Sequence, residues 1–306
     1  MLFLIPDTGA VSAEIHALAK ADQMDRASAQ AYFEHQKEVA PRDRARLLRA
    51  RQIVAKAAHL SPQDLDSLAL IFQHGERAED FEVARELSII AFARGKFGST
   101  PALAEDRFLT TIGKKQRFGS QFSWSAEGTP VWKDLAGEDA YSVTDASRLD
   151  FLQPPLSEIK QRGLEAFQKP DERMFERLMQ SRDSKWQTRA SSRELWNWFR
   201  KRKRSRFARS DVQKILALYH ADRLRAPRDA YIAASVLGSF QTESSLLLAN
   251  ELAVYSLCRG YAPARPVFAR TCDRLFAVWG LRPRFGTIRG RAPCAAPIVN
   301  DFFLRR

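Results

Sequence analysis

Part of this chain is repeated within it. Residues 84–95 return 165 positions later as residues 249–260, and residues 106–119 return 167 positions later as residues 273–286. Polar and apolar positions stay in register, and the two offsets differ only by a short loop insertion. We therefore predict two diverged copies of one structural unit. The identical residues of the longer match include Asp106, Arg107, Gly113, Arg117, Phe118 and Gly119.

Each copy is predicted to consist of helices joined by short turns. In the first copy, Ser61 and Pro62 are typical of a helix start. Apolar residues then recur at spacings of three and four over residues 79–94, and a glycine closes that helix. A third helix is predicted over residues 101–112, followed by a short extended segment or loop at residues 115–122. The expected fold class is mainly α, with a helical hairpin, a third helix and a short extended segment in each copy.

The repeat divides the chain into two units. Residues 1–160 hold the first helical unit with N-terminal helices, and two basic helices are expected within residues 14–58. Residues 161–306 hold the second, basic and diverged unit. A long connecting region, residues 150–225, joins the repeated cores and is interrupted by a proline pair.

The net charge of +13 belongs to the second unit. Residues 1–160 contain 20 Lys and Arg against 23 Asp and Glu, whereas residues 161–306 contain 29 against 13. Such a field favours an acidic partner, which charge alone does not identify as protein, nucleic acid or an anionic membrane surface.

Cysteine usage and hydropathy suggest where the protein resides. Its three cysteines, Cys258, Cys272 and Cys294, lie far apart without a paired motif, so reduced thiols are expected. No apolar run approaches the roughly 20 residues of a membrane span, and the apolar start Met1–Ile5 is short and ends at a proline. We therefore expect a cytoplasmic protein with no transmembrane segment.

Gln73-His74, Asp106-Arg107 and the segment from Gly113 to Phe122 resemble an uncharacterised bacterial family, domain-of-unknown-function family 6624. The resemblance covers roughly residues 60–165, with a diverged second copy at about residues 225–290. It implies no established activity, cofactor or catalytic residue. The second copy departs from the pattern at three polar positions: Ser239 replaces His74, Pro283 replaces Gln116 and Ile288 replaces Gln121.

A candidate chemical site lies in the first unit. His74, Glu86 and Asp106 are candidate catalytic residues, because a helical hairpin brings the end of one helix near the start of the next. A histidine with two carboxylates suits acid–base chemistry. No metal is expected, since metal-ligand spacing such as H-x-x-x-H is absent, and no cofactor is expected either. The candidate ligand-binding residues are Gln73, His74, Arg107, Gln116 and Gln121.

A structural role is the alternative for several of these residues. Glu86, Arg94, Asp106 and Arg107 keep their counterparts in the second copy, where His74 does not. Retention in a copy that has lost its polar lining indicates fold maintenance, for example through buried carboxylate–arginine pairs. The glycines flanking residues 114–118 are expected to permit positive φ in a tight connection rather than to form a phosphate loop.

The sharpest local feature is the basic run at residues 200–209, which follows Trp186, Trp196, Trp198 and Phe199. Cations beside aromatic rings suit nucleic acid or an anionic surface. A helix with one apolar face and one solvated basic face gives the same pattern. The candidate partner-binding residues are Arg200, Lys201, Arg202, Lys203, Arg204, Arg206 and Arg209.

Three functions follow as hypotheses. The leading one is a non-catalytic or accessory helical protein that binds an acidic partner, a protein above all, through its basic C-terminal half. The second is a small-molecule enzyme or ligand-binding protein with its site around His74. The third is nucleic-acid binding through residues 200–209, although no zinc-finger, RNP or helix-turn-helix motif accompanies them.

Overall fold

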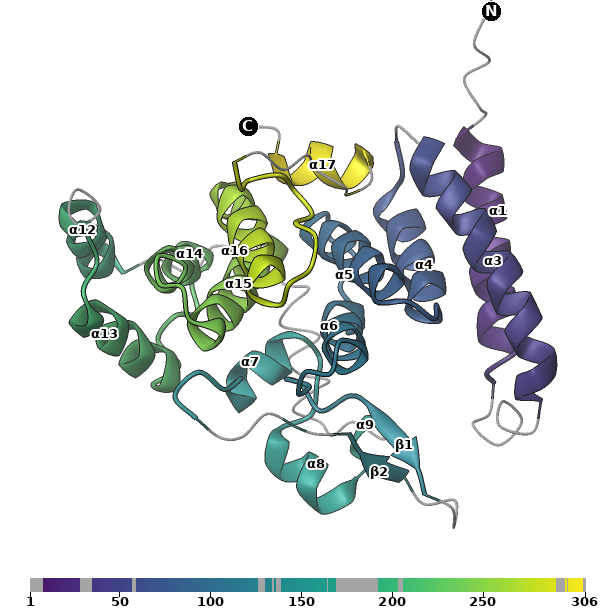
Figure 1. Cartoon of the computed structure of the whole chain (residues 1–306), viewed down its shortest axis with the longest axis horizontal. Helices are drawn as coiled ribbons and strands as arrows, with labels where there is room; N and C mark the ends of the chain where they lie inside the picture. Colours follow the sequence, from purple (N-terminus) through teal and green to yellow (C-terminus); the bar gives the residue numbers. More distant parts are fainter. Residues whose placement is uncertain are drawn as a thin grey trace, which may run out of the picture.

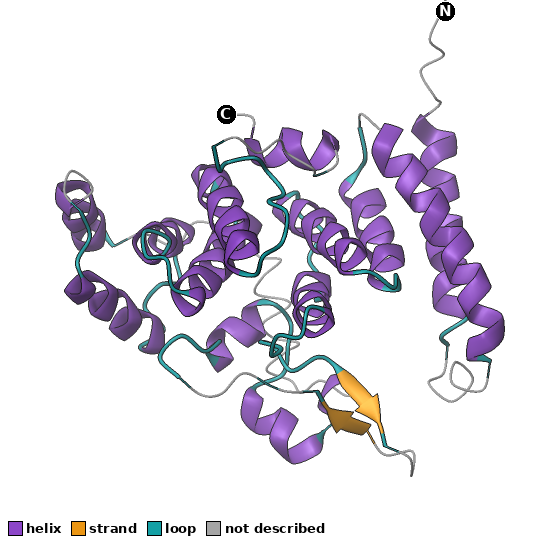
Figure 2. Cartoon of the chain, in the orientation of Figure 1, coloured by secondary structure: helices purple, strands orange, loops and turns teal. Residues whose placement is uncertain are grey.

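The computed structural model describes residues 8–27, 35–56, 59–125, 130–133, 135, 139–163, 165–168, 192–202, 206–289, 295 and 297–304. The protein is mainly α-helical, as predicted (Figure 2). The first half contains α1 (Thr8–Met24), α3 (Gln36–Lys56), α4 (Pro62–Gln73), α5 (Ala78–Ala93), α6 (Thr100–Thr111), β1 (Phe122–Trp124), β2 (Pro130–Trp132), α7 (Asp145–Asp150) and α8 (Leu156–Arg162). The second contains α9 (Glu165–Gln168), α12 (Arg193–Arg202), α13 (Arg209–His220), α14 (Pro227–Leu237), α15 (Glu243–Cys258), η1 (Ala262–Ala264), α16 (Arg265–Val278) and α17 (Pro297–Leu304).

The helix boundaries of the first unit follow from local chemistry. Ser61 caps α4 through a capping box, in which its hydroxyl accepts from Asp64 N–H while the Asp64 carboxylate accepts from Ser61 N–H. Helix α5 is followed by a turn with Gly95 at positive φ, and α6 by a turn with Gly113 at positive φ. The predicted hairpin and third helix are therefore confirmed as α4, α5 and α6.

The second unit has the same order of elements, with α14 and α15 as a hairpin and α16 as the third helix. The first unit continues into the antiparallel pair β1–β2, where Ser123 faces Val131. Residues 281–288 follow α16 as non-helical chain, and no strand is described there. The order of elements agrees with a duplicated unit, while the duplication itself remains a prediction.

The core runs through both units. Helices α5 and α15 are buried on nearly all faces, which places them at the centre of the molecule and in contact with each other. A single cluster of buried apolar side chains extends over both predicted units. In Figure 1, α1 and α3 lie together at one edge, and α12 and α13 lie at the opposite edge. The two ends of the molecule are thus separated by the shared core.

Two buried ion pairs cross between the units in a reciprocal way. Arg117 of the first unit binds Glu251 of the second at 2.5 Å, and Arg284 of the second binds Glu86 of the first at 2.6 Å. These are equivalent residues at the offsets of 167 and 165 positions. Arg85 also donates a hydrogen bond to Asn250, the residue 165 positions later. Positions that match in the predicted repeat therefore face each other.

Three expectations about the flanking regions need correction or qualification. Helix α1 begins at Thr8 and is not basic, because its only Lys or Arg is Lys20, against two acidic residues. The region from 150 to 225 is more than a linker, since it contains α8, α9, α12 and α13. The N-terminal residues 1–7 lie outside the described part of the chain.

The described cysteines, Cys258 and Cys272, are free thiols buried in the core, as expected for reduced residues. Cys294 lies outside the described residues. Among the helices that the structure describes, none has the length and apolar character needed to cross a membrane.

Candidate functional site

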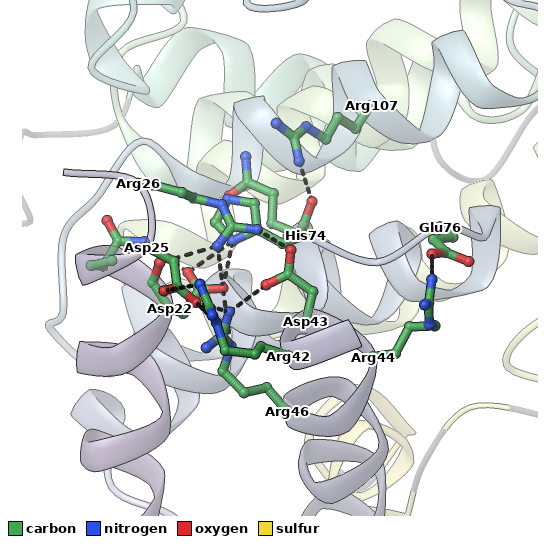
Figure 3. Close-up of polar contacts among 12 residues, drawn as sticks. Asp22, Asp25, Arg26, Arg42, Asp43, Arg44, Arg46, His74, Glu76 and Arg107 are labelled. Carbon is green, nitrogen blue, oxygen red and sulfur yellow. Dashed lines mark hydrogen bonds and ion pairs between the residues drawn. The ribbon is translucent and has the colours of Figure 1, made fainter. Parts of the chain in front are cut away.

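His74 is the C-cap residue of α4, and its ring lies against the end of α1 (Figure 3). The ring Nδ1 is 2.9 Å from Asp22 Oδ2, and the two side chains are 15% and 1% exposed. Burial lowers the pKa of His74, although the Asp22 carboxylate opposes this shift. The His74 ring is therefore favoured in its neutral form. Because an ionised carboxylate only accepts, Nδ1 donates to Asp22.

Asp22 stays ionised because its surroundings favour its charge. Burial alone would raise the pKa of Asp22, but the hydrogen bond from His74 and the positive charge of Arg26 lower it below its ordinary value. Together with two further carboxylates and three guanidinium groups, Asp22 joins the end of α1 to α3 (Figure 3). The pairs are Arg26 with Asp22 and Asp43, Arg42 with Asp25, and Arg46 with Asp22, Asp25 and Asp43. The charges of this cluster balance, so it needs no external ion.

Arg107 approaches the same corner from α6 (Figure 3). It donates one hydrogen bond to the Gln73 carbonyl oxygen and another, of 3.1 Å, to Gln121 Oε1. Its positive charge helps to lower the pKa of His74. Gln116 spans the turn that follows, because its amide donates to Gln121 O at 2.9 Å and its Oε1 accepts from Gln121 N–H at 2.8 Å. The side chains of Arg107 and Gln116 therefore serve largely to bind backbone groups of Gln73 and Gln121.

The structure does not join His74 to the other two catalytic candidates. Glu86 is fully buried and binds Arg284 in a two-pronged ion pair. Asp106 is also fully buried and accepts hydrogen bonds from three backbone N–H groups of residues 117–120 and from the Ser120 hydroxyl. Burial raises the pKa of Asp106, while these N–H donors oppose the rise. No hydrogen bond links either carboxylate to His74, and no group of metal-binding side chains occurs among the described residues.

The basic segment forms the surface of α12 and α13. Arg200 and Lys201 are exposed at the end of α12, Arg206 is exposed in the segment before α13, and Arg209 is exposed at the start of α13. Arg202 is different, because it pairs with Asp211 at 3.0 Å. The two remaining candidates, Lys203 and Arg204, lie outside the described residues. We call the exposed set, Arg200, Lys201, Arg206 and Arg209, the basic surface.

The aromatic residues of α12 belong to the fold. Phe199 is buried, and Trp196 and Trp198 pack against the core. The guanidinium of Arg228 covers the Trp196 ring at 3.5 Å, and the ammonium of Lys214 covers the Trp198 ring at 4.7 Å. Trp186 lies outside the described residues. The sequence-based alternative of an amphipathic helix therefore accounts for these rings.

The other arginine-rich helix behaves differently from α12. Every arginine of α3 lies within ion-pair distance of a carboxylate: Arg42 with Asp25, Arg44 with Glu76, Arg46 with Asp43, Arg49 with Glu14 and Arg51 with Asp80. Within the described chain, no carboxylate pairs with any residue of the basic surface. The cations of α3 are used inside the molecule, and those of the basic surface are not.

Sequence reasoning missed Asp22, the residue that holds His74. The two lie 52 positions apart, and no motif connects them. Comparison with known proteins adds no further assignment, since no family model, no curated protein and no solved structure matches this chain. The resemblance to family 6624 therefore remains a prediction.

Proposed function

We propose that this protein is a non-catalytic, accessory helical protein of the cytoplasm that binds an acidic protein segment through the basic surface. The observation that carries this proposal is that no carboxylate of the described residues pairs with the positive charges of the basic surface. Residues 193–214 contain nine Lys and Arg against two Asp and Glu. One of these two, Asp211, is already engaged by Arg202. An acidic partner would supply the missing counter-charge.

The way α12 is anchored supports a preformed docking surface. Leu195 and Phe199 are buried against the core, so the helix presents Arg200 and Lys201 from a fixed base. The Asp211 carboxylate accepts from Ala208 N–H at 2.7 Å and also binds Arg202, which ties the start of α13 to α12. Cations held on packed helices lose less conformational freedom on binding than cations on a loose tail.

A protein partner fits better than single-stranded nucleic acid. Nucleic-acid binding of that kind relies on aromatic rings on which bases stack. Here Trp196 and Trp198 are already covered by Arg228 and Lys214. Acidic side chains need only the exposed cations, which the basic surface supplies.

The test is fluorescence anisotropy with a labelled poly-glutamate peptide, alongside labelled single- and double-stranded DNA, at low and raised salt. The variant Arg200→Ala/Lys201→Ala/Arg209→Ala removes three charges from the basic surface. Its matched control, Lys20→Ala/Lys37→Ala/Lys115→Ala, removes the same charge from exposed positions elsewhere. We expect the first variant to lose about tenfold or more in peptide affinity and the control to bind nearly like the wild type.

Salt should weaken peptide binding to the wild type more steeply than to the basic-surface variant. Equal losses in the two triple variants would show that net charge, and not this surface, attracts the peptide. DNA binding without peptide binding would show that the basic surface binds nucleic acid and not an acidic protein. Absence of any binding at low salt would remove the proposal.

A further inference from the structure

A cleft of about 340 Å³ is lined by none of the residues of the basic surface or of the His74 corner. Its walls come from the ends of α5 and α15, the start of α16, and α17. Arg94, Arg265 and Phe302 line it, and His59 and Asp301 are exposed lining residues. Its volume lies at the lower end of the range for small-molecule sites.

The two arginines of the cleft share one aromatic ring and have no carboxylate partner. The Arg265 guanidinium lies 4.3 Å from the centre of the Phe302 ring, and the Arg94 guanidinium lies 5.7 Å from it. Arg94 donates one hydrogen bond of 3.3 Å to the Leu60 carbonyl oxygen. Arg265 Nε is buried without a hydrogen-bond partner. The described contacts include no ion pair between either arginine and Asp301.

The positive charges of Arg94 and Arg265 lie close together without a carboxylate partner among the described residues, which is electrostatically unfavourable. Partial burial, and then the neighbouring charge of Arg265, lower the pKa of Arg94. Two like charges beside the same ring repel each other, and a bound anion would relieve that repulsion. Arginine is also the side chain best suited to two-pronged contacts with carboxylate or phosphate oxygens.

The second unit shows what the equivalent arginine does when a carboxylate is present. Arg259 stands 165 positions after Arg94 and likewise follows its helix as the C-cap. Arg259 Nη2 lies 3.5 Å from Asp150 Oδ1, and both side chains are buried. For Arg259, the first unit of the chain therefore provides the anion, Asp150.

Phe302 takes the place that Asp150 has in the other unit. The segments that carry these residues are anchored by edge-on ring pairs of nearly equal geometry: Phe118 with Phe151 at 5.5 Å, and Phe285 with Phe303 at 5.4 Å. Phe118 and Phe285 are equivalent in the repeat. The residue before each anchoring ring is Asp150 in one case and Phe302 in the other. The carboxylate that would meet Arg94 is therefore replaced by a phenyl ring beside an open cleft.

We propose that this cleft binds a small molecule through an oxyanion group, a carboxylate or a phosphate, held by Arg94 and Arg265 in the place of the missing aspartate. Phe302 supplies the apolar floor on which both guanidinium groups lie. His59, exposed in the lining, is placed to face the part of the ligand that extends from the oxyanion. This site is distinct from both the basic surface and the His74 corner.

The experiment is isothermal titration calorimetry of the full chain with inorganic phosphate and, separately, with succinate, at constant ionic strength. Arg94→Gln and Arg265→Gln each remove one cation of the cleft. Arg270→Gln is the matched control, because Arg270 is exposed on α16 and does not line the cleft. Circular dichroism of each variant verifies folding, and Arg94, being exposed, can be replaced without opening the core.

We expect saturable binding of at least one of the two probes. Each cleft variant should weaken it by about tenfold or more, whereas Arg270→Gln should bind like the wild type. A preference for phosphate assigns a phosphorylated ligand, and a preference for succinate assigns a carboxylic acid. Lack of saturable binding of both probes, or equal affinity in all three variants, overturns the proposal.

Discussion

Glu82 is a buried acid that the proposed functions do not use. Its Oε1 lies 3.6 Å from Cys272 Sγ and 3.8 Å from Arg85 Nη1, and its Oε2 is buried without a hydrogen bond. Burial raises the pKa of Glu82 to about 7, with Arg85 opposing and Glu86 adding to the rise. An acid enclosed in this way prefers its protonated form.

This raised pKa predicts a pH dependence of stability. Below the unfolded-state value of 4.5, the carboxyl is protonated in both states. Between that value and about 7, the folded state keeps a proton that the unfolded state has lost. Stability contributed by Glu82 therefore falls as pH rises through this window. Glu82→Gln should remove the loss and be more stable than wild type at about pH 8 by roughly 2–4 kcal/mol.

Urea unfolding of wild type and variant at about pH 5 and about pH 8 measures the effect. Glu79→Gln serves as control, since Glu79 is exposed on the same helix and no described contact engages it. If the difference between wild type and Glu82→Gln is the same at both pH values, Glu82 is ionised in the folded protein.

At the scale of elements, one aspartate in each unit organises the turn after its third helix. Asp106 accepts from the N–H groups of Phe118 and Ser120, both at 2.9 Å. Asp273 accepts from Phe285 N–H at 2.8 Å and Thr287 N–H at 2.6 Å. A carboxylate has enough acceptor sites for all of these donors, whereas an amide has one oxygen.

Asp106→Asn should therefore destabilise the protein by about 1–3 kcal/mol, because its NH2 group would face backbone donors and leave buried N–H groups unpaired. Chemical denaturation gives this value directly. Amide hydrogen exchange of residues 117–120 should also speed up, since these N–H groups lose their acceptor. Unchanged exchange in a destabilised variant would assign the loss to some other contact.

The helices and caps of the repeated units were predictable because their signals are local. Ser61, Pro62 and Gly113 act within one turn of their own positions. The polar corner was not, because Asp22 reaches His74 from a helix 52 positions away. The apolar spacing in α12 was equally compatible with a binding surface and a buried face, and only packing shows that Phe199 is buried.

For the molecule as a whole, the repeat predicts which residues match each other but not which partners they bind. The sequence shows that Glu86 matches Glu251 and that Arg117 matches Arg284. Nothing in the chain indicates that each arginine binds the glutamate of the other unit, because periodicity fixes positions along a helix and not the packing between helices. The reciprocal pairs give Glu251 and Arg284 the same structural role as Glu86 and Arg117.

These pairs predict that the two units depend on each other for stability. Glu86→Gln removes the carboxylate that binds the buried Arg284 and should cost about 3–5 kcal/mol in urea unfolding. Replacing both partners with apolar residues, as in Glu86→Leu/Arg284→Met, should cost much less, because no charge is left buried. Glu14→Gln breaks the exposed pair with Arg49 and should cost far less than Glu86→Gln. A Glu86→Gln cost no larger than that of Glu14→Gln would mean that water reaches Arg284 and that this ion pair does not tie the two units together.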